Sequence, residues 1–176
     1  MRGDLVQNER GGWGGTTGVQ YQSQNAKIRG DEKYLPDSRK QNLALFTLQT
    51  LQKGRVRFEG ALRVESAKLN ADADPQIAAN GGTIGLAPIS RSFAPLSASI
   101  GANYEFLPDW RLGLTLSHSA RAPAIDDLFS NGPHGGSQQF LRGNPDLGLE
   151  KSNGVELSVH RITGPIRLQG SVYYSR

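Results

Sequence analysis

The sequence has no cysteine and only one methionine among its 176 residues. Without cysteine the chain can form no disulfide, no thiolate nucleophile and no cysteine-ligated metal site. It also lacks any run of about 18 apolar residues, so we expect no membrane-spanning helix. Met1-Arg2-Gly3-Asp4 is not followed by an apolar segment. This start therefore does not resemble a signal peptide, and we expect the natural N-terminus to lie upstream.

Charge of one sign is not concentrated in any segment. The chain carries 20 Lys and Arg against 16 Asp and Glu, and the basic residues are scattered. A nucleic-acid partner would need a basic patch, so none is expected. Catalytic motifs such as Gly-x-Ser-x-Gly and His-Glu-x-x-His are missing, and the calcium-loop-like start at Asn70 lacks the required Gly and Glu. We therefore expect that the protein is not an enzyme.

Alternation of apolar and polar side chains is the strongest pattern that is present. Between Arg55 and Glu65, charged residues occupy every second position except Ala61 and oppose apolar ones. A period of two places each set on one face of a β-sheet. Strands are predicted at residues 16–24, 39–51, 55–65, 93–106, 112–117, 151–161 and 166–176. Segment 39–51 has apolar residues on both faces, which leaves a short helix open, and segment 1–8 is too short to classify.

Short and long connections alternate along the chain. Turns are expected near residues 11–15, 52–54, 107–109 and 162–165, and long polar loops at 25–38, 66–90 and 119–150. The loop at 66–90 contains so much Gly, Pro and Asp that we expect no regular structure in it. In an antiparallel meander, this alternation places all turns at one end of the strands and all long loops at the other.

The fold class predicted is therefore all-β, an antiparallel transmembrane β-barrel segment with short periplasmic turns and long extracellular loops. Apolar strand faces would contact lipid, and polar faces would line the lumen. A few strands with open edges cannot close a barrel, so we expect the chain to be an internal piece of a larger one. Two alternatives remain from the pattern alone: a passive pore or adhesin barrel, and a soluble β-rich binding module.

Two segments that flank the longest loop resemble those of a known family. Residues 116–129, Leu-Ser-His-Ser-Ala-Arg-Ala-Pro-Ala-Ile-Asp-Asp-Leu-Phe, resemble the S-x-x-x-R-A-P-x-x-x-E/D-L-F segment of TonB-dependent outer-membrane receptors. Residues 143–152, Gly-Asn-Pro-Asp-Leu-Gly-Leu-Glu-Lys-Ser, are similar to the G-N-P-x-L-x-x-E-x-S segment of the same family. The two segments stand in the family's order and at a family-like separation.

The resemblance implies a receptor in the outer membrane of a Gram-negative bacterium. Its barrel would have 22 strands around an N-terminal plug, and residues 1–176 would be part of that barrel, without the plug, the TonB box and the final strands. The partners implied are the TonB complex, through the plug, and outer-membrane lipid. The implied ligand is a scarce nutrient, a metal ion or metal chelate such as zinc, a siderophore or haem. Zinc would be cargo, and no resident cofactor is expected.

The loop motif also allows a local prediction. Pro123 suits the first turn of a short helix, Asp126 and Asp127 suit its N-terminal half, and Asn131-Gly132 would stop it. Arg121 can reach carboxylates or loop carbonyls with its fork of donors. We expect these residues mainly to fold the loop at the barrel rim, and we name Arg121, Asp126 and Asp127 as candidate ligand-binding residues.

Histidine supplies the candidate metal ligands. Asn-Gly-Pro-His134 follows Leu-Phe and resembles a loop of the zinc-receptor branch of the family. His118 would lie at the same, external end, so His118 and His134 could share a metal with Asp126 or Asp127. His160 would lie near the opposite end, roughly 30 Å away at about 3.3 Å per residue, and could not join them.

Overall fold

Each long strand pairs with the next along the chain in the computed structural model, which describes residues 1–30, 32–136, 138–161, 163 and 166–176. Within these residues one sheet contains nine strands, in the order β1-β2-β3-β4-β6-β7-β10-β11, with β5 paired to the end of β4. The strands of this sheet are β1 (Arg2–Arg10), β2 (Trp13–Ala26), β3 (Ser38–Lys53), β4 (Val56–Ala71), β5 (Ile89–Phe93), β6 (Leu96–Leu107), β7 (Trp110–Arg121), β10 (Glu150–Arg161) and β11 (Leu168–Ser175). All of these pairings are antiparallel, as predicted.

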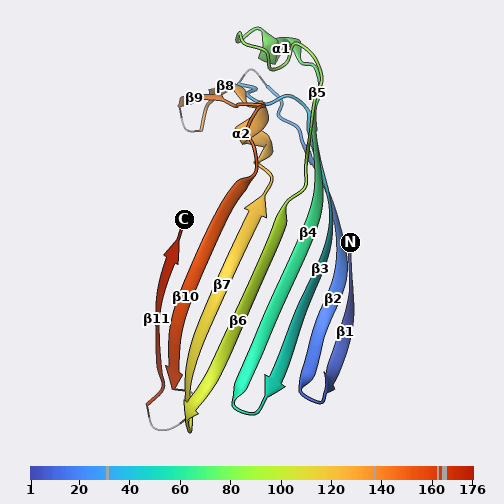
Figure 1. The fold of residues 1–176 in the computed structure, drawn as a ribbon. Coiled ribbons are helices and arrows are strands. Elements are labelled where there is room, and N and C mark those ends of the chain that lie inside the picture. Colours follow the sequence, from blue (N-terminus) through green and yellow to red (C-terminus); the bar gives the residue numbers. More distant parts are fainter. Residues whose placement is uncertain (31, 137, 162, 164–165) are drawn as a thin grey trace.

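The two ends of the sheet differ as the connection lengths predicted. Tight turns at 11–12, 54–55 and 108–109 lie at one end, and the long loops lie at the other (Figure 1). The expected turn at 162–165 lies outside the described residues, apart from Thr163. No helix among the described residues is long and apolar enough to cross a lipid bilayer.

Most strands run longer than the alternation predicted, although β11 is shorter than the predicted 166–176, and the loops are more ordered. Segment 39–51 belongs to β3 and is not a helix, and segment 1–8 belongs to β1. The predicted strand 93–106 is divided into β5 and β6 at Pro95, because proline has no N–H to donate to a ladder. The rest of the regular structure lies in the loops: α1 (Pro75–Ala78), α2 (Ile125–Phe129), β8 (Asn131–His134) and β9 (Gln139–Arg142).

The expectation of no regular structure at 66–90 was wrong at both ends and in the middle. Strand β4 continues to Ala71, β5 begins at Ile89, and α1 forms at Pro75. Asp74 caps α1, because its carboxylate accepts from the backbone N–H of Gln76 at 3.1 Å and of Ile77 at 3.3 Å. Asp at the N-cap followed by Pro is a common start of a helix. The sequence prediction missed it because the surrounding Gly, Pro and Asp residues are also typical of turns.

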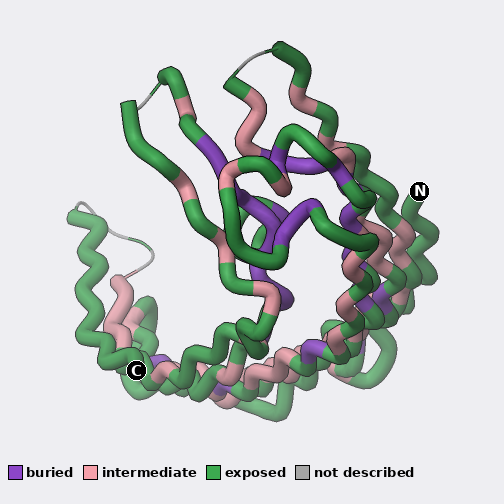
Figure 2. Tube along the Cα trace, turned by 90° about the horizontal axis from the view of Figure 1, so that it is seen from above, coloured by how far each residue is buried: buried purple, intermediate pink, exposed green. Residues whose placement is uncertain are grey.

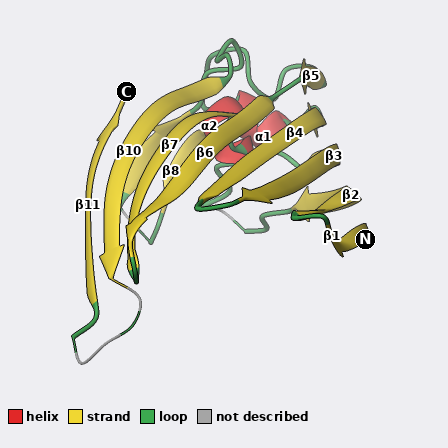
Figure 3. Ribbon diagram, turned by 60° about the horizontal axis from the view of Figure 1, so that its bottom comes forward, coloured by secondary structure: helices red, strands yellow, loops and turns green. Residues whose placement is uncertain are grey.

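The register separates the two faces of the sheet. Leu45 pairs with Val19 on one side and Val64 on the other, while its chain neighbour Phe46 pairs with Gly18 and Arg63. Figure 2 shows the sheet as an arc with the loops gathered inside its curve, and Figure 3 shows the same curvature from another side. The face of Arg63 also carries the residues on which those loops pack, so the polar face is concave and the apolar face convex.

A buried apolar core lies beneath the loops, at the loop end of the concave face. Its central side chains, Leu69, Leu128 and Phe129, are completely inaccessible to solvent. The cluster consists of Leu35, Ala67, Leu69, Ala71, Ala122, Ile125, Leu128 and Phe129. Burying each large apolar side chain contributes about 1.5–3 kcal/mol, so this core holds α2 and the neighbouring loops against β4.

Asn131 connects the three long loops through its backbone and side chain. Its backbone N–H donates to the carbonyl of Tyr34 at 2.7 Å, and its Nδ2 donates to the carbonyls of Ile77 at 3.0 Å and Gly81 at 2.7 Å. Its own carbonyl accepts from Asn80 Nδ2 at 2.8 Å. Because Asn131 is only 2% exposed, these hydrogen bonds satisfy groups that water cannot reach.

Ion pairs join the first two long loops as well. The Asp37 carboxylate accepts from Arg29 at 2.8 and 3.1 Å and lies 3.6 Å from the Lys33 ammonium, which also pairs with Asp74. The hydrogen bond from Arg29 is the main reason that the pKa of Asp37 is lowered. The loop between β2 and β3 is thus attached to the capping residue of α1.

The second family-like segment closes the longest loop against α2. The N–H of Gly143 donates to the carbonyl oxygen of Ser130 at 2.6 Å, and the N–H of Asn144 donates to the carbonyl oxygen of Asp127 at 2.8 Å. A Cβ on Gly143 would lie 2.7 Å from the carbonyl carbon of Leu128, closer than real Cβ contacts. Glycine at this position allows the loop backbone to touch the end of the helix.

Replacing Phe129 with alanine should loosen the loops without unfolding the sheet. Phe-to-Ala changes in a packed core cost about 3–5 kcal/mol, and here the cavity would form under α2. We expect faster amide hydrogen exchange in the loops of the detergent-solubilised protein, with strand amides little changed. The control is Phe140→Ala, since Phe140 is 53% exposed in the same loop. Equal exchange in the two variants would refute the role of this core.

Replacing Gly143 with alanine should have a similar local effect for a different reason. The added methyl group would collide with backbone atoms of Leu128 and Phe129, which cannot move without displacing α2. Gly148→Ala is the matched control, because a Cβ there meets nothing within 4 Å. Limited proteolysis should cleave the loop of the Gly143→Ala protein faster. Identical cleavage of both variants would show that the close approach is not needed.

Candidate ligand-capture site at the loop end

Arg121 and Glu150 join the two family-like segments. They are cross-strand partners on β7 and β10, and Arg121 Nε donates to Glu150 Oε2 at 2.6 Å. The Arg121 side chain remains 78% exposed, so its remaining donors are accessible to a ligand. The expected reach of Arg121 to a carboxylate is therefore confirmed, and its contact with a ligand stays a prediction.

A polar pocket of about 320 Å³ lies beside Arg121 on the concave face. Its other charged lining residues are Lys40, Arg63 and Glu65, which come from β3 and β4. Arg63 donates to Glu65 at 2.7 Å, and among described residues Lys40 has no ion-pair partner. Glu65 and Glu150 pair with the two arginines, so Lys40 leaves this pocket with an excess of one positive charge.

The two aspartates of the motif have different environments. Asp127 accepts at Oδ2 from the backbone N–H of Ala124 at 3.2 Å and so holds the start of α2. Both carboxylates lie in the first turn, as predicted, where the helix N-terminus stabilises negative charge. Pro123 precedes the N-cap Ala124, so it lies just before the first turn rather than in it. Both residues are exposed, and among the described residues only the Asp127 side chain accepts a hydrogen bond, which leaves the Asp126 carboxylate free to contact a ligand.

His134 lies in the β8–β9 hairpin, in the loop layer beyond the sheet (Figure 1). Its ring packs against Tyr34, with ring centroids 4.7 Å apart and planes inclined by 54°. Burial, and then the charge of Asp126, raise the pKa of the Tyr34 hydroxyl, so this phenol stays neutral at physiological pH. The hydroxyl is therefore a hydrogen-bond donor close to the candidate metal ligand.

His118 lies elsewhere. It belongs to β7 and pairs with Ala98 and Asn153, which places it on the convex face with Leu116. Its Nδ1 donates to Asn153 Oδ1 at 2.7 Å. His134, by contrast, is in the loop layer that packs on the concave side. No group of three His, Cys, Asp or Glu that could hold a metal exists among the described residues, so the shared site expected for His118 and His134 is not formed here.

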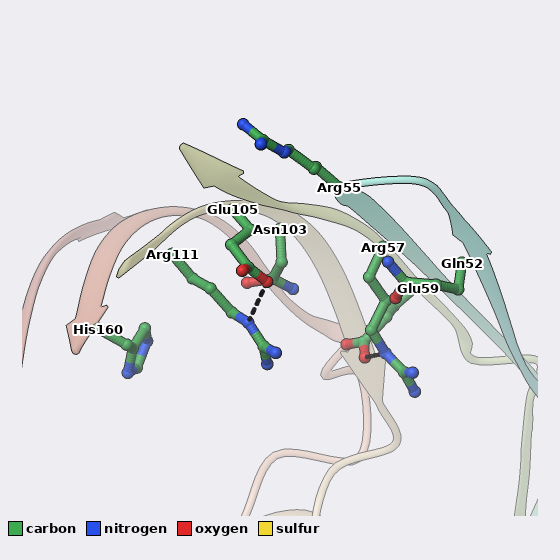
Figure 4. Close-up of a pocket in the computed structure, with 8 residues that line it drawn as sticks. All are labelled: Gln52, Arg55, Arg57, Glu59, Asn103, Glu105, Arg111 and His160. Atoms are coloured by element: carbon green, nitrogen blue, oxygen red, sulfur yellow. Dashed lines mark hydrogen bonds and ion pairs between the residues drawn. The ribbon is translucent and has the colours of Figure 1, made fainter. Parts of the chain in front are cut away.

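His160 is at the turn end, as expected. It lines a pocket of about 370 Å³ on the concave face together with charged residues of β4, β6 and β7 (Figure 4). Arg57 pairs with Glu59 at 2.9 Å and Arg111 with Glu105 at 3.9 Å. His160 lies seven positions along β10 from Asn153, the partner of His118, which is about 23 Å along the strand.

Sequence reasoning did not single out Lys40, Arg63 or Tyr34. The alternation had already placed Arg63 on the polar face, but nothing indicated which of several charged residues lie beside Arg121. That choice depends on the register between β3 and β4 and on α2 covering part of the face. Tyr34 carried no motif, and only the packing of two loops brings it to His134.

Comparisons with known proteins agree with this architecture. The family model described as TonB dependent receptor-like, beta-barrel matches residues 2–176. A structure titled "Copper transporter OprC" superposes with a TM-score of 0.75 at 17% identity, covering 98% of this chain and 29% of that one.

A second structure is that of a double mutant of the Serratia marcescens hemophore receptor HasR in complex with its hemophore HasA and heme. It gives a TM-score of 0.72 at 20% identity, covering 99% of this chain and 31% of that one. The chain thus spans under a third of the length of either structure. At these identities the superpositions show a shared fold.

Barrels of this family are outer-membrane proteins of Gram-negative bacteria, which is the location that the alternating strands and the motifs predicted. The interpretation as a soluble module is therefore wrong, and the exposed apolar convex face has its explanation in lipid contact. The match of nearly the whole sequence to the family model, together with the fold, shows that the chain belongs to the TonB-dependent receptor-like β-barrel family, whose members are transporters and not enzymes.

Proposed function

We propose that the chain is part of a receptor that takes up a metal ion or metal chelate across the outer membrane with energy passed on by TonB. The observation that carries this proposal is the polar, cation-rich pocket beside Arg121 at the loop end of the concave face. A ligand that arrives from the loop side meets this pocket before it meets the rest of the lumen. Family membership supports uptake over a passive pore or an adhesin.

Within this proposal the favoured cargo is an anionic metal chelate. Lys40, Arg63 and Arg121 can donate to carboxylate or other acidic groups of such a ligand, and the guanidinium groups can do so with two parallel hydrogen bonds. Copper and haem, named in the titles of the two similar structures, are compatible with a metal-containing cargo in this chain.

His134 is proposed to contact the metal of the captured ligand, and Asp126 to lie within reach of the same ligand. The imidazole is a good neutral ligand for several transition metals. The phenol of Tyr34, packed on the ring, would orient it. Bound zinc is then cargo, held by this residue and by groups that the ligand or other parts of the receptor supply.

The 22-stranded barrel, the plug and the TonB contact are proposed to complete the receptor outside residues 1–176. TonB would act through the plug, so this segment would contribute the lumen wall and the capturing loops. A passive pore would need neither a plug nor a contact with TonB. Finding a plug and a TonB box in the complete gene would therefore separate the two functions.

Replacing Lys40 with glutamine should weaken the binding of an anionic metal chelate. One solvent-accessible charge contact contributes up to about 1 kcal/mol, so we expect a roughly fivefold rise in Kd. Haemin, which carries two carboxylates, is the probe, and its absorbance is titrated against the complete receptor in detergent. Lys53→Gln is the control, because Lys53 ends the same strand at the turn end. An unchanged haemin Kd for Lys40→Gln would show that this pocket does not take part in ligand capture.

Replacing His134 with alanine should reduce the affinity for metal. Calorimetry with zinc chloride on the complete receptor should show at least about a tenfold loss, because even the loss of a group that only supports a metal ligand costs about 10–100-fold in affinity. His160→Ala should leave the titration unchanged, since His160 lies at the other end of the sheet. If zinc binds equally well to both variants, His134 does not contact the metal and the β8–β9 hairpin has only a structural role.

A further inference from the structure

The convex face distributes its charges differently from the concave face. On the strands of the sheet from β3 to β11, every charged residue that the cross-strand pairing assigns to the convex face is cationic. These residues are Arg39, Lys53, Lys68, Lys151, Arg161 and Arg176. The concave face of the same strands carries both signs, in pairs such as Arg57–Glu59 and Arg63–Glu65.

The convex cations also lie only at strand ends, with apolar residues between them. On β4 the convex series runs Phe58, Leu62 and Val64 before it reaches Lys68, and on β10 it runs from Val159 to Val155 before Lys151. The apolar side chains of this band are substantially exposed, for example Leu45 at 57% and Ile100 at 63%. An exposed apolar belt of this kind is the part of a barrel that contacts hydrocarbon.

Aromatic residues mark the turn-end border of this belt. Trp110 and Phe106 pack with ring centroids 6.3 Å apart, and the Arg161 guanidinium lies 5.7 Å from the Trp110 ring. Aromatic girdles are usual where a barrel meets the lipid headgroups. The cations at the loop end therefore lie at the level of the opposite headgroup layer, because they begin where the apolar belt stops.

Two of these cations are close neighbours. Arg39 pairs with Asn70, and Lys68 is two residues from Asn70 on β4, so Arg39 and Lys68 are diagonal neighbours roughly 7–8 Å apart. Both are exposed, and neither forms an ion pair with a residue that the structure describes. Lys151 is a third exposed cation at the loop end of this face, and it also forms no ion pair with a described residue.

We propose that Arg39 and Lys68, and farther along the sheet Lys151, bind phosphate groups on the lipids of the outer leaflet. The argument is charge complementarity: unpaired cations without any neighbouring carboxylate on this face lie at headgroup depth, where phosphates are the available anions. The leaflet assignment rests on the proposed function, in which the loops face outward. Binding would hold the barrel at a fixed depth beneath the capturing loops.

The test measures lipid binding to the complete receptor in detergent by native mass spectrometry. The probes are diphosphorylated lipid A and the same lipid without phosphates, with inorganic phosphate as a soluble competitor. The wild type should bind the diphosphorylated lipid at least about tenfold more tightly, since each basic residue near such a surface adds about a fivefold gain. Arg39→Gln/Lys68→Gln should abolish most of that preference.

The matched control is Lys53→Gln/Arg55→Gln, which removes the same charge from the same hairpin at its turn end. Retention of the preference in Arg39→Gln/Lys68→Gln, or its equal loss in the control, would overturn the proposal. So would competition by millimolar inorganic phosphate, which would indicate a site for the free anion. Heat-modifiable migration on gels verifies folding, and Lys68→Gln alone replaces the double variant if that one fails to fold.

Haemin titration of the same variants separates this proposal from the proposed function. Arg39 and Lys68 point away from the lumen, so their replacement should leave the haemin Kd unchanged. Loss of phosphate preference with intact haemin binding supports the lipid contact by itself. A receptor that fails to bind haemin but keeps its lipid preference would overturn only the cargo assignment.

Discussion

The constraint on which the rest of this structure depends is that each long strand must pair its backbone with the next one. A segment in lipid has no water to satisfy its N–H and C=O groups, so the ladder of hydrogen bonds must be continuous. Continuous antiparallel pairing fixes the register, and the register assigns every side chain to one face. The apolar convex face, the charged concave face and the position of the loops all follow from it.

The loops are held in place by a second, smaller core. Leu69 of β4, Leu128 and Phe129 of α2 exclude water from the loop end of the concave face, and Asn131 satisfies the backbone groups that this burial removes from solvent. The residues of the two family-like segments are mostly used here: Gly143 permits the contact with α2, and Arg121 pairs with Glu150. A rigid rim is what a capturing surface needs, because ordering a flexible loop on binding would reduce affinity.

The fold could be predicted from the sequence to a large extent, and the candidate site only in part. The alternation between Arg55 and Glu65 and the order of turns and loops indicated the sheet, its polarity and its surroundings. The division at Pro95, helix α1 after Asp74 and the β8–β9 hairpin were missed, because local turn composition outweighed short stretches of regular structure. His118 and His134 were grouped by their place along the chain, whereas the register puts His118 on the convex face.

By itself the sequence determined which side chains share a strand face, because the period of two is a property of any extended chain. It also determined the family, whose model matches residues 2–176 and which the segments around Arg121 and Gly143 resemble. The tertiary structure alone decided which residues meet across strands and loops: Lys40 and Arg63 beside Arg121, Tyr34 against His134, and Arg39 beside Lys68. These contacts join residues far apart in sequence, so they depend on register and packing, which no local pattern specifies.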